Sequence, residues 1–140
     1  MKRLLFAGIL LTVLQVSAQK IDATKVPAIV KVTFTKAYPN TTAKWEMEDK
    51  NYEVAFKQNG KNITVVIDSK AQLLETETDI KLNELPKAAA DYLSAHYKGK
   101  KIAETSMIKK ANGDINYEAE VNKVDVIFDS KGNFLKEVKG

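Results

Sequence analysis

The single histidine is the first side chain to test for catalytic chemistry. His96 is the only imidazole among 140 residues, and the chain has no cysteine, which excludes cysteine nucleophiles, disulfides and thiolate or multi-histidine metal sites. A catalytic histidine needs a serine or a carboxylate within hydrogen-bond reach, and the sequence has no Gly-x-Ser-x-Gly motif. His96 falls near the end of a predicted helix, where its charge favours the helix dipole. We therefore predict a structural histidine and no catalytic residue.

The acidic residues could suggest acid–base or calcium chemistry. Glu118 and Glu120 fall on one face of a predicted strand, and Asp125 and Asp129 fall on one face of the next. Paired carboxylates do acid–base work in glycosidases, but nothing in the sequence marks a cleft around these, and a solvated strand face explains them better. Residues 129–132 lack the repeated Asp/Asn ligands of a calcium loop. We predict no metal site and no cofactor.

The N-terminus has the three parts of a secretory signal peptide. A basic start at residues 2–3 precedes a mostly apolar run over residues 4–16, and residues 16–18 provide a cleavage site before Gln19. The apolar run is too short to span a bilayer comfortably, and no second run follows it. We predict that residues 1–18 are cleaved and that the mature protein has no membrane span. The protein is then periplasmic or secreted.

Cleavage changes the charge balance. The whole chain has 22 Lys+Arg against 18 Asp+Glu, but the predicted signal peptide contains Lys2 and the only arginine, Arg3. The mature chain keeps 20 lysines and no guanidinium group, the group that makes bidentate contacts to phosphates and base edges. We predict no nucleic-acid partner.

The mature sequence contains the same ordered set of features twice. Val26-Pro27 and Leu85-Pro86 each precede a helix-forming stretch that ends in a tyrosine, and Tyr-Glu strands and Asp-Ser-Lys turns follow in the same order. A repeated order of this kind indicates a tandem duplication. We predict a signal peptide (1–18), an N-terminal extension (19–24), a first repeat (25–83) and a second repeat (84–140).

Each repeat is predicted to open with a helix and to continue as about four antiparallel strands, the last one short. Pro27 and Pro86 suit the first turn of a helix, and residues 88–95 are rich in strong helix formers. Residues 29–35 are rich in β-branched side chains that favour a strand, and the repeat decides for a helix there. The predicted inward helix faces are Val30, Phe34, Ala37 and Tyr38 in the first repeat and Ala89, Leu93, His96 and Tyr97 in the second.

Period-two alternation of apolar and polar residues predicts the strands, with one face buried beneath the helix and the other facing water. The alternation is clearest in residues 43–48, 52–57, 63–68, 117–121 and 124–128. The large aromatic residues on these strands fall on the apolar side, and we predict that they form part of the core. The alternative is an aromatic binding platform. For Trp45, both core and contact surface stay open. These aromatic residues are Trp45, Tyr52, Phe56 and Tyr117.

The ordered set of features resembles the PepSY-like, beta-lactamase-inhibitor-like domains of secreted bacterial proteins, those of Bacteroidetes especially. The shared features are the Leu/Val-Pro start, the helix ending in an aromatic residue, the Tyr-Glu-Val-like strand (52–54) and the Asp-initiated hairpin turn (129–132). The resemblance implies an α+β fold like that of beta-lactamase inhibitor proteins, with two tandem helix-plus-antiparallel-sheet repeats and a concave sheet surface. It also implies a non-catalytic binding or inhibitory role outside the cytoplasm.

The water-facing side of the predicted sheets is the candidate contact surface. Val66 and Ile127 hold equivalent places there in the two repeats, and exposed apolar residues on a polar face often mark contact. We predict that an extracytoplasmic protein docks on this face, and that docking inhibits the partner if it is an enzyme. Binding of a small molecule or peptide in a groove between the repeats is the alternative. The candidate protein-binding residues are Lys44, Glu46, Glu53, Lys57, Thr64, Val66, Glu118, Glu120, Asp125 and Ile127.

Overall fold

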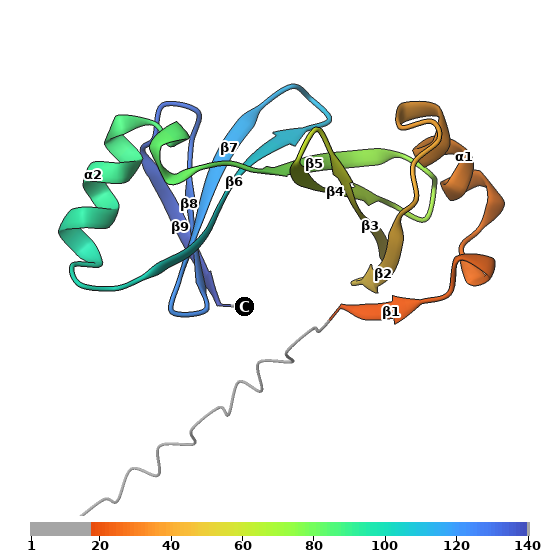
Figure 1. The fold of residues 1–140 in the computed structure, drawn as a ribbon, viewed down its shortest axis with the longest axis horizontal. Helices are drawn as coiled ribbons and strands as arrows, with labels where there is room; N and C mark the ends of the chain where they lie inside the picture. The colour runs from red at the N-terminus through yellow and green to blue at the C-terminus, as the bar shows by residue number, and fades with distance from the viewer. Residues whose placement is uncertain (1–17, 140) are drawn as a thin grey trace, which may run out of the picture.

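In the described part of the chain, a single antiparallel sheet of nine strands carries two helices on one of its faces (Figure 1). The computed structural model describes residues 18–139. The strands lie across the sheet in the order of the sequence. Their bounds are β1 (Gln19–Ile21), β2 (Lys44–Glu48), β3 (Asn51–Gln58), β4 (Lys61–Ile67), β5 (Leu73–Asp79), β6 (Ile102–Lys110), β7 (Ile115–Val121), β8 (Val124–Phe128) and β9 (Phe134–Lys139). The helices are α1 (Ala28–Ala37) and α2 (Lys87–His96), each preceded by a 3₁₀ turn, Ala23–Lys25 or Leu82–Glu84.

The predicted α+β fold with two helix-plus-sheet units is confirmed, but the strand count per unit was incomplete. A strand also precedes each helix and pairs with the strand that follows it, β1 with β2 and β5 with β6. Strand β5 therefore ends the first unit and begins the second. The sequence predicts only an extension over residues 19–24, because a three-residue strand leaves no alternation to detect. The last strands are not short either, since β5 and β9 have seven and six residues.

Both helices begin directly after the predicted prolines. The carbonyl groups of Pro27 and Pro86 accept the first helical hydrogen bonds, each from an amide 3.1 Å away. The β-branched residues of α1 do not prevent the helix, because Val30 and Phe34 bury its inner face against the sheet. Of the predicted inward faces, Ala37 and its counterpart His96 are exposed, whereas Tyr38 and Tyr97 are partly buried against the two cores as predicted.

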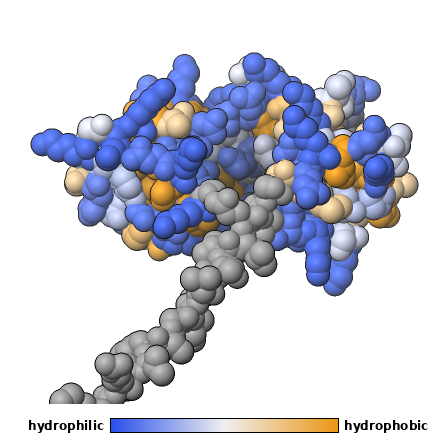
Figure 2. All heavy atoms as spheres, turned by 90° about the horizontal axis from the view of Figure 1, so that it is seen from below, coloured by the Kyte–Doolittle hydropathy of each residue, from blue (hydrophilic) through white to orange (hydrophobic). Residues whose placement is uncertain are grey.

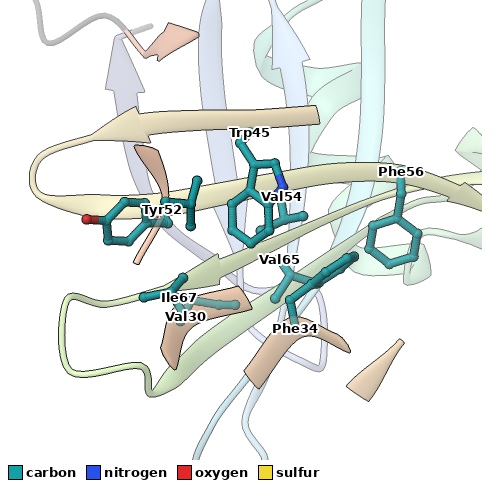
Figure 3. Packing of buried hydrophobic residues seen from close by; sticks show 9 residues of the cluster. Val30, Phe34, Trp45, Tyr52, Val54, Phe56, Val65 and Ile67 are labelled. Atoms are coloured by element: carbon teal, nitrogen blue, oxygen red, sulfur yellow. The ribbon is translucent and has the colours of Figure 1, made fainter. Parts of the chain in front are cut away.

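The first unit has an aromatic core. The Phe34 ring meets Trp45 and Phe56 edge to face, with centroids 5.6 and 5.4 Å apart (Figure 3). Trp45, Tyr52 and Phe56 are all buried, which confirms core rather than a binding platform. Trp45 is covered because β1 makes β2 an inner strand of the sheet.

The second unit has a core of smaller residues. Leu93 of α2 packs with Val126 and Phe128 of β8, and two buried alanines, Ala89 and Ala119, occupy places held by valines in the first unit. The predicted core residue Tyr117 is half-buried against the same cluster.

Tight two-residue turns fix the register of the hairpins. Asn59-Gly60 and Asn122-Lys123 both have positive φ at their two central positions, as a type I′ turn requires. The structure adds a third such turn at Asp49-Lys50, whose φ values are 46° and 70°. Because side chains alternate between faces, the register decides which residues lie beneath the helices and which lie on the other face.

The sheet bends between its two ends, and the helices lie on its outer side. In Figure 1, α1 and α2 lie at opposite ends of the molecule, with the strands curving between them. The opposite face of the sheet is turned inward, and no helix of the described residues covers it. Seen from below, both halves carry a mostly hydrophilic surface (Figure 2).

Candidate functional site

We call the sheet face opposite the helices the inner face. Directly opposed residues of an antiparallel pair point to the same face, so the register assigns every strand residue to one side. One row of the inner face runs Glu46–Glu53–Val66–Glu75 across β2 to β5. All ten predicted contact residues lie on this face, and their contact with a partner remains a prediction. The inner face also includes Ala55, Glu75, Glu77, Asp79, Glu104, Ser106, Ile108, Lys110, Asn116, Lys136 and Val138.

Carboxylates concentrate on two strands that lie on either side of β6. Strand β5 carries Glu75, Glu77 and Asp79, and strand β7 carries Glu118 and Glu120. The β5 residues are not among the contact residues predicted from the sequence. The available signal was the alternation of acidic residues with threonine over residues 75–79. We call these five residues, together with Asp125 on the neighbouring β8, the acidic strip.

The floor of the acidic strip is formed by small and apolar residues. On β6, Ser106 and Ile108 are only 3% and 9% exposed, although no helix covers this face. The Ser106 hydroxyl donates a hydrogen bond of 2.8 Å to Oε1 of Glu77. Ser106 lies in register between Asp79 and Glu118.

The predicted exposure of Ile127 is wrong. Ile127 does lie on the inner face, but it is only 6% exposed, and its counterpart Val66 is half-buried. Ile127 lies in register between Glu118 and Lys136, whose longer side chains flank it on the concave side of the sheet. Ile127 therefore belongs to the buried floor of the inner face. The atoms that a partner can reach more easily are those of the charged residues around it.

Burial and mutual repulsion raise the pKa values of carboxyl groups in the acidic strip. Burial, followed by the charges of Glu77 and Asp125, raises the pKa of Glu118 to about 8. Burial also raises the pKa of Glu77, although the hydrogen bond from Ser106 opposes the shift. The pKa of Asp125 is raised by burial and by the charge of Glu120. At neutral pH this surface therefore holds protons that ordinary surface carboxylates have lost.

The first unit repeats the arrangement at its equivalent position. Glu53 opposes Val66 as Glu118 opposes Ile127, and both glutamates follow the matched tyrosine of their repeat. Burial, and then a hydrogen bond with the Glu48 side chain, raises the pKa of Glu53 to about 7. Each unit thus places one proton-retaining glutamate beside an aliphatic residue on the inner face.

The described residues provide no ion pair for the acidic strip. Within residues 18–139, ion pairs join Lys61 to Glu84 and Lys87 to Asp91, and all four residues lie outside the inner face. Lys110 is opposite Glu75 but does not come within ion-pair distance of it. In the same part of the chain, no group of three acidic, histidine or cysteine side chains is arranged to hold a metal ion.

His96 lies on α2, on the other side of the sheet. Its Nδ1–H donates to the Tyr92 carbonyl at 3.0 Å, and its ring stacks on the Tyr92 ring with centroids 3.9 Å apart. The other face of the Tyr92 ring stacks on Phe134 of β9 at 4.8 Å. The Tyr92–Phe134 contact joins α2 to the last hairpin, whereas both contacts of His96 are with Tyr92 of its own helix.

The two helices on one side of a sequentially ordered antiparallel sheet, with the concave side uncovered, define an α+β protein of the beta-lactamase-inhibitor type. The chain belongs to the PepSY-like, beta-lactamase-inhibitor-like family, whose model matches residues 13–75 and again residues 59–136. The two matches overlap in β4 and the start of β5. The repeat boundaries at 25–83 and 84–140 remain a prediction.

Solved structures from Bacteroides share the fold. A DUF2874 family protein from Bacteroides uniformis superposes with a TM-score of 0.72 at 22% identity, covering 81% of this chain and 88% of that chain. A protein from Bacteroides eggerthii that is described as periplasmic gives 0.73 at 20% identity, with the same coverage. A BLIP-like protein from Bacteroides fragilis gives 0.61 at 26% identity, covering 80% of this chain and 84% of that chain. Among curated proteins, none matches this sequence.

Neither helix in the described part of the chain has the length and apolar character needed to cross a membrane. The predicted signal peptide lies outside the described residues, apart from Ala18.

Proposed function

We propose that this protein is a non-catalytic, periplasmic or secreted protein-binding module, and that its inner face docks on a protein partner. One observation carries the proposal: the inner face extends across the sheet and is left open by both helices, which lie on its other side. Likeness to a BLIP-like protein supports the same use of the fold. Where the partner is an enzyme, docking over its active site inhibits it by steric exclusion.

A sheet surface of this kind is suited to docking because it is formed before the partner arrives. Its side chains project from paired strands whose register is fixed by tight turns and by two separate cores. Little conformational entropy is then lost on binding, and more of the contact free energy is kept as affinity.

Capture from the native organism's envelope tests the proposal. The bait is the chain from residue 19 to 140, cross-linked in the extract, and the captured proteins are identified by mass spectrometry. The blocking variant is Ala55→Trp, because Ala55 is exposed on the inner face between Lys44 and Thr64. The control is Ser94→Trp, at an exposed position on α2.

We expect one protein to be enriched by the unmodified chain and by Ser94→Trp, and to be lost with Ala55→Trp. A protein captured equally by all three chains binds elsewhere and contradicts docking on the inner face.

Small-molecule or peptide binding is the second candidate. A depression of about 380 Å³ lies over β2, β3 and β4, within the first unit and not between the repeats, where the sequence predicts the groove. It is lined by Thr42 to Lys44, Ala55 to Lys57 and Asn62 to Thr64. Its volume is in the range of small-ligand sites. A ligand that copurifies with the secreted protein in native mass spectrometry, and is lost with Ala55→Trp, favours this function over protein docking.

A further inference from the structure

We propose that the inner face recognises a basic segment of its partner, with a lysine or arginine side chain lying along β6 between the carboxylates of β5 and β7. The proposal rests on the protein-binding function above and specifies the chemistry of the partner.

The geometry of β6 suits a long cationic side chain. Neighbouring strands lie about 4.8 Å apart, so β5 and β7 are separated by roughly 10 Å. Ile108 lies between Glu77 and Asn116, and Ser106 lies between Asp79 and Glu118. An aliphatic stem can pack on Ile108 while its charged end reaches Glu77 and Glu118, the arrangement that lysine and arginine adopt elsewhere.

The charge distribution favours a cation over other occupants. The chain as a whole has more basic than acidic residues, yet the acidic strip forms no ion pair in residues 18–139. The same residues are not arranged as a metal site. An acidic partner surface is repelled by the strip, whereas a basic segment supplies the charges that the strip lacks.

Binding of a cation must displace protons from the strip. The pKa of Glu118 is raised to about 8, and a nearby positive charge favours the ionised form, so Glu118 releases its proton when the cation binds at pH 7. Affinity then increases as pH rises from 6 to 8. The charged groups that share the inner face around Glu118 are Glu75, Glu77, Asp79, Glu104, Lys110, Glu120, Asp125 and Lys136.

Titration calorimetry on the chain from residue 19 to 140 tests the proposal. The probe is an end-blocked Lys-Val-Lys-Val-Lys peptide, and the matched control peptide has glutamate at each lysine position. Phosphate and Tris buffers at pH 7 differ in ionisation enthalpy and so reveal how many protons are released. We expect release of about one proton per bound peptide, and about tenfold or greater tightening between pH 6 and 8. The glutamate peptide should not bind.

Charge-removing variants locate the binding. The double variant Glu77→Gln/Glu118→Gln should lose affinity by about tenfold or more and release no proton. The control Asp91→Asn, on α2 and outside the inner face, should bind like the unmodified chain. The glutamine variants remove mutual repulsion and should stay folded, which circular dichroism checks.

The proposal is overturned if the lysine peptide does not bind, if binding survives in Glu77→Gln/Glu118→Gln, or if no proton is released. The envelope capture separates this failure from failure of the proposed function. If a partner is lost with Ala55→Trp but is still captured by Glu77→Gln/Glu118→Gln, then the protein-docking function stands. The same result overturns the proposal that a basic segment is recognised.

Discussion

The two units follow one plan on the helix side of the sheet but fill their cores differently. In the first unit, the rings of Phe34, Trp45 and Phe56 occupy the space between α1 and the strands. In the second unit, the buried residues Ala89 and Ala119 are small. The second unit buries one phenylalanine, Phe128, and further aromatic rings stack at the outer edge of the helix, where Tyr92 stacks on His96 and Phe134.

The turn before the last strand of each unit shows how closely each helix packs. At Gly132 an added Cβ would lie 2.8 Å from the Ala89 nitrogen and from the Pro86 Cβ. The equivalent residue of the first unit is Ala71, which already carries a Cβ at a φ of 64°. Its carbonyl accepts a hydrogen bond of 2.8 Å from the Thr33 hydroxyl of α1.

The inner face keeps one pair of residue types in both units, although other equivalent positions differ: Lys44, Ala55 and Thr64 of the first unit correspond to Glu104, Glu120 and Asp125 of the second. Glu53 beside Val66 and Glu118 beside Ile127 keep the same side-chain types in the same register. The comparison teaches that core volume is exchangeable between the units, because helix and sheet adjust together, whereas the glutamate and its aliphatic neighbour recur on the face that we assign to binding.

The largest expected effect tests the aromatic core. Phe34→Ala removes the ring that Trp45 and Phe56 both contact, and should cost about 3–5 kcal/mol in the free energy of unfolding. Urea denaturation measures the loss. Leu93→Ala, the matched change in the second unit, should cost less, and equal losses would contradict a distinct role for the aromatic rings.

The next effect tests the closeness of α2. Gly132→Ala introduces the clash with Pro86 and Ala89 at a φ of 87°, and should destabilise the protein by about 2–4 kcal/mol. Ala71→Gly should change the stability by less than about 1 kcal/mol, because a turn there already tolerates a side chain. Thermal unfolding measures both variants. Equal shifts in melting temperature would contradict a closer packing of α2 on its turn than of α1.

The third effect distinguishes a buried residue of the inner face, Ile127, from its more accessible counterpart, Val66. Ile127→Ala should cost about 2–3 kcal/mol because the side chain is buried, whereas Val66→Ala should cost about 1 kcal/mol or less. Chemical denaturation measures both. A negligible loss at Ile127 would restore it as an exposed contact residue.

The smallest effect concerns the paired glutamates. Because the folded-state pKa of Glu118 is raised to about 8, folded chains bind more protons than unfolded chains between the two pKa values, and stability falls as pH rises through 8. Part of the side chain contacts water, so we expect a decrease of only about 1–2 kcal/mol between pH 5 and 9.

Glu118→Gln should flatten that profile, and Glu53→Gln should do so by a smaller amount at lower pH, since the pKa of Glu53 is raised to about 7. The control Asp91→Asn should leave the slope unchanged. A slope that survives both glutamine variants assigns the pH dependence to other groups.

Much of the fold followed from local patterns. The repeated order of features predicted a helix between Pro27 and Pro39 although the β-branched composition there opposes it, because the equivalent segment of the second repeat has clear helix formers; the structure has α1 there. Period-two alternation then assigned the two sheet faces, and all ten predicted contact residues lie on the inner one.

The remaining features depend on partners distant in the sequence. Strand β1 exists because its three residues pair with Trp45 to Met47, and no local pattern shows that. The acidic strip arises where β5 and β7 flank β6, so its raised pKa values depend on a strand order that alternation alone does not give. The burial of Ile127 reflects the curvature of the sheet and the length of its neighbours' side chains.

The strictly sequential order of the strands has a consequence for how the chain folds. Each of the strands β2 to β8 pairs with the one before it and the one after it, so no strand has to enter between two that are already paired. Contact order is then low for a protein with this much β-structure, and each closure spans one turn or one helix. The sheet can grow strand by strand from the N-terminus. Once the first unit has folded, its last strand, β5, presents an ordered edge on which β6, the next strand of the second unit, can pair.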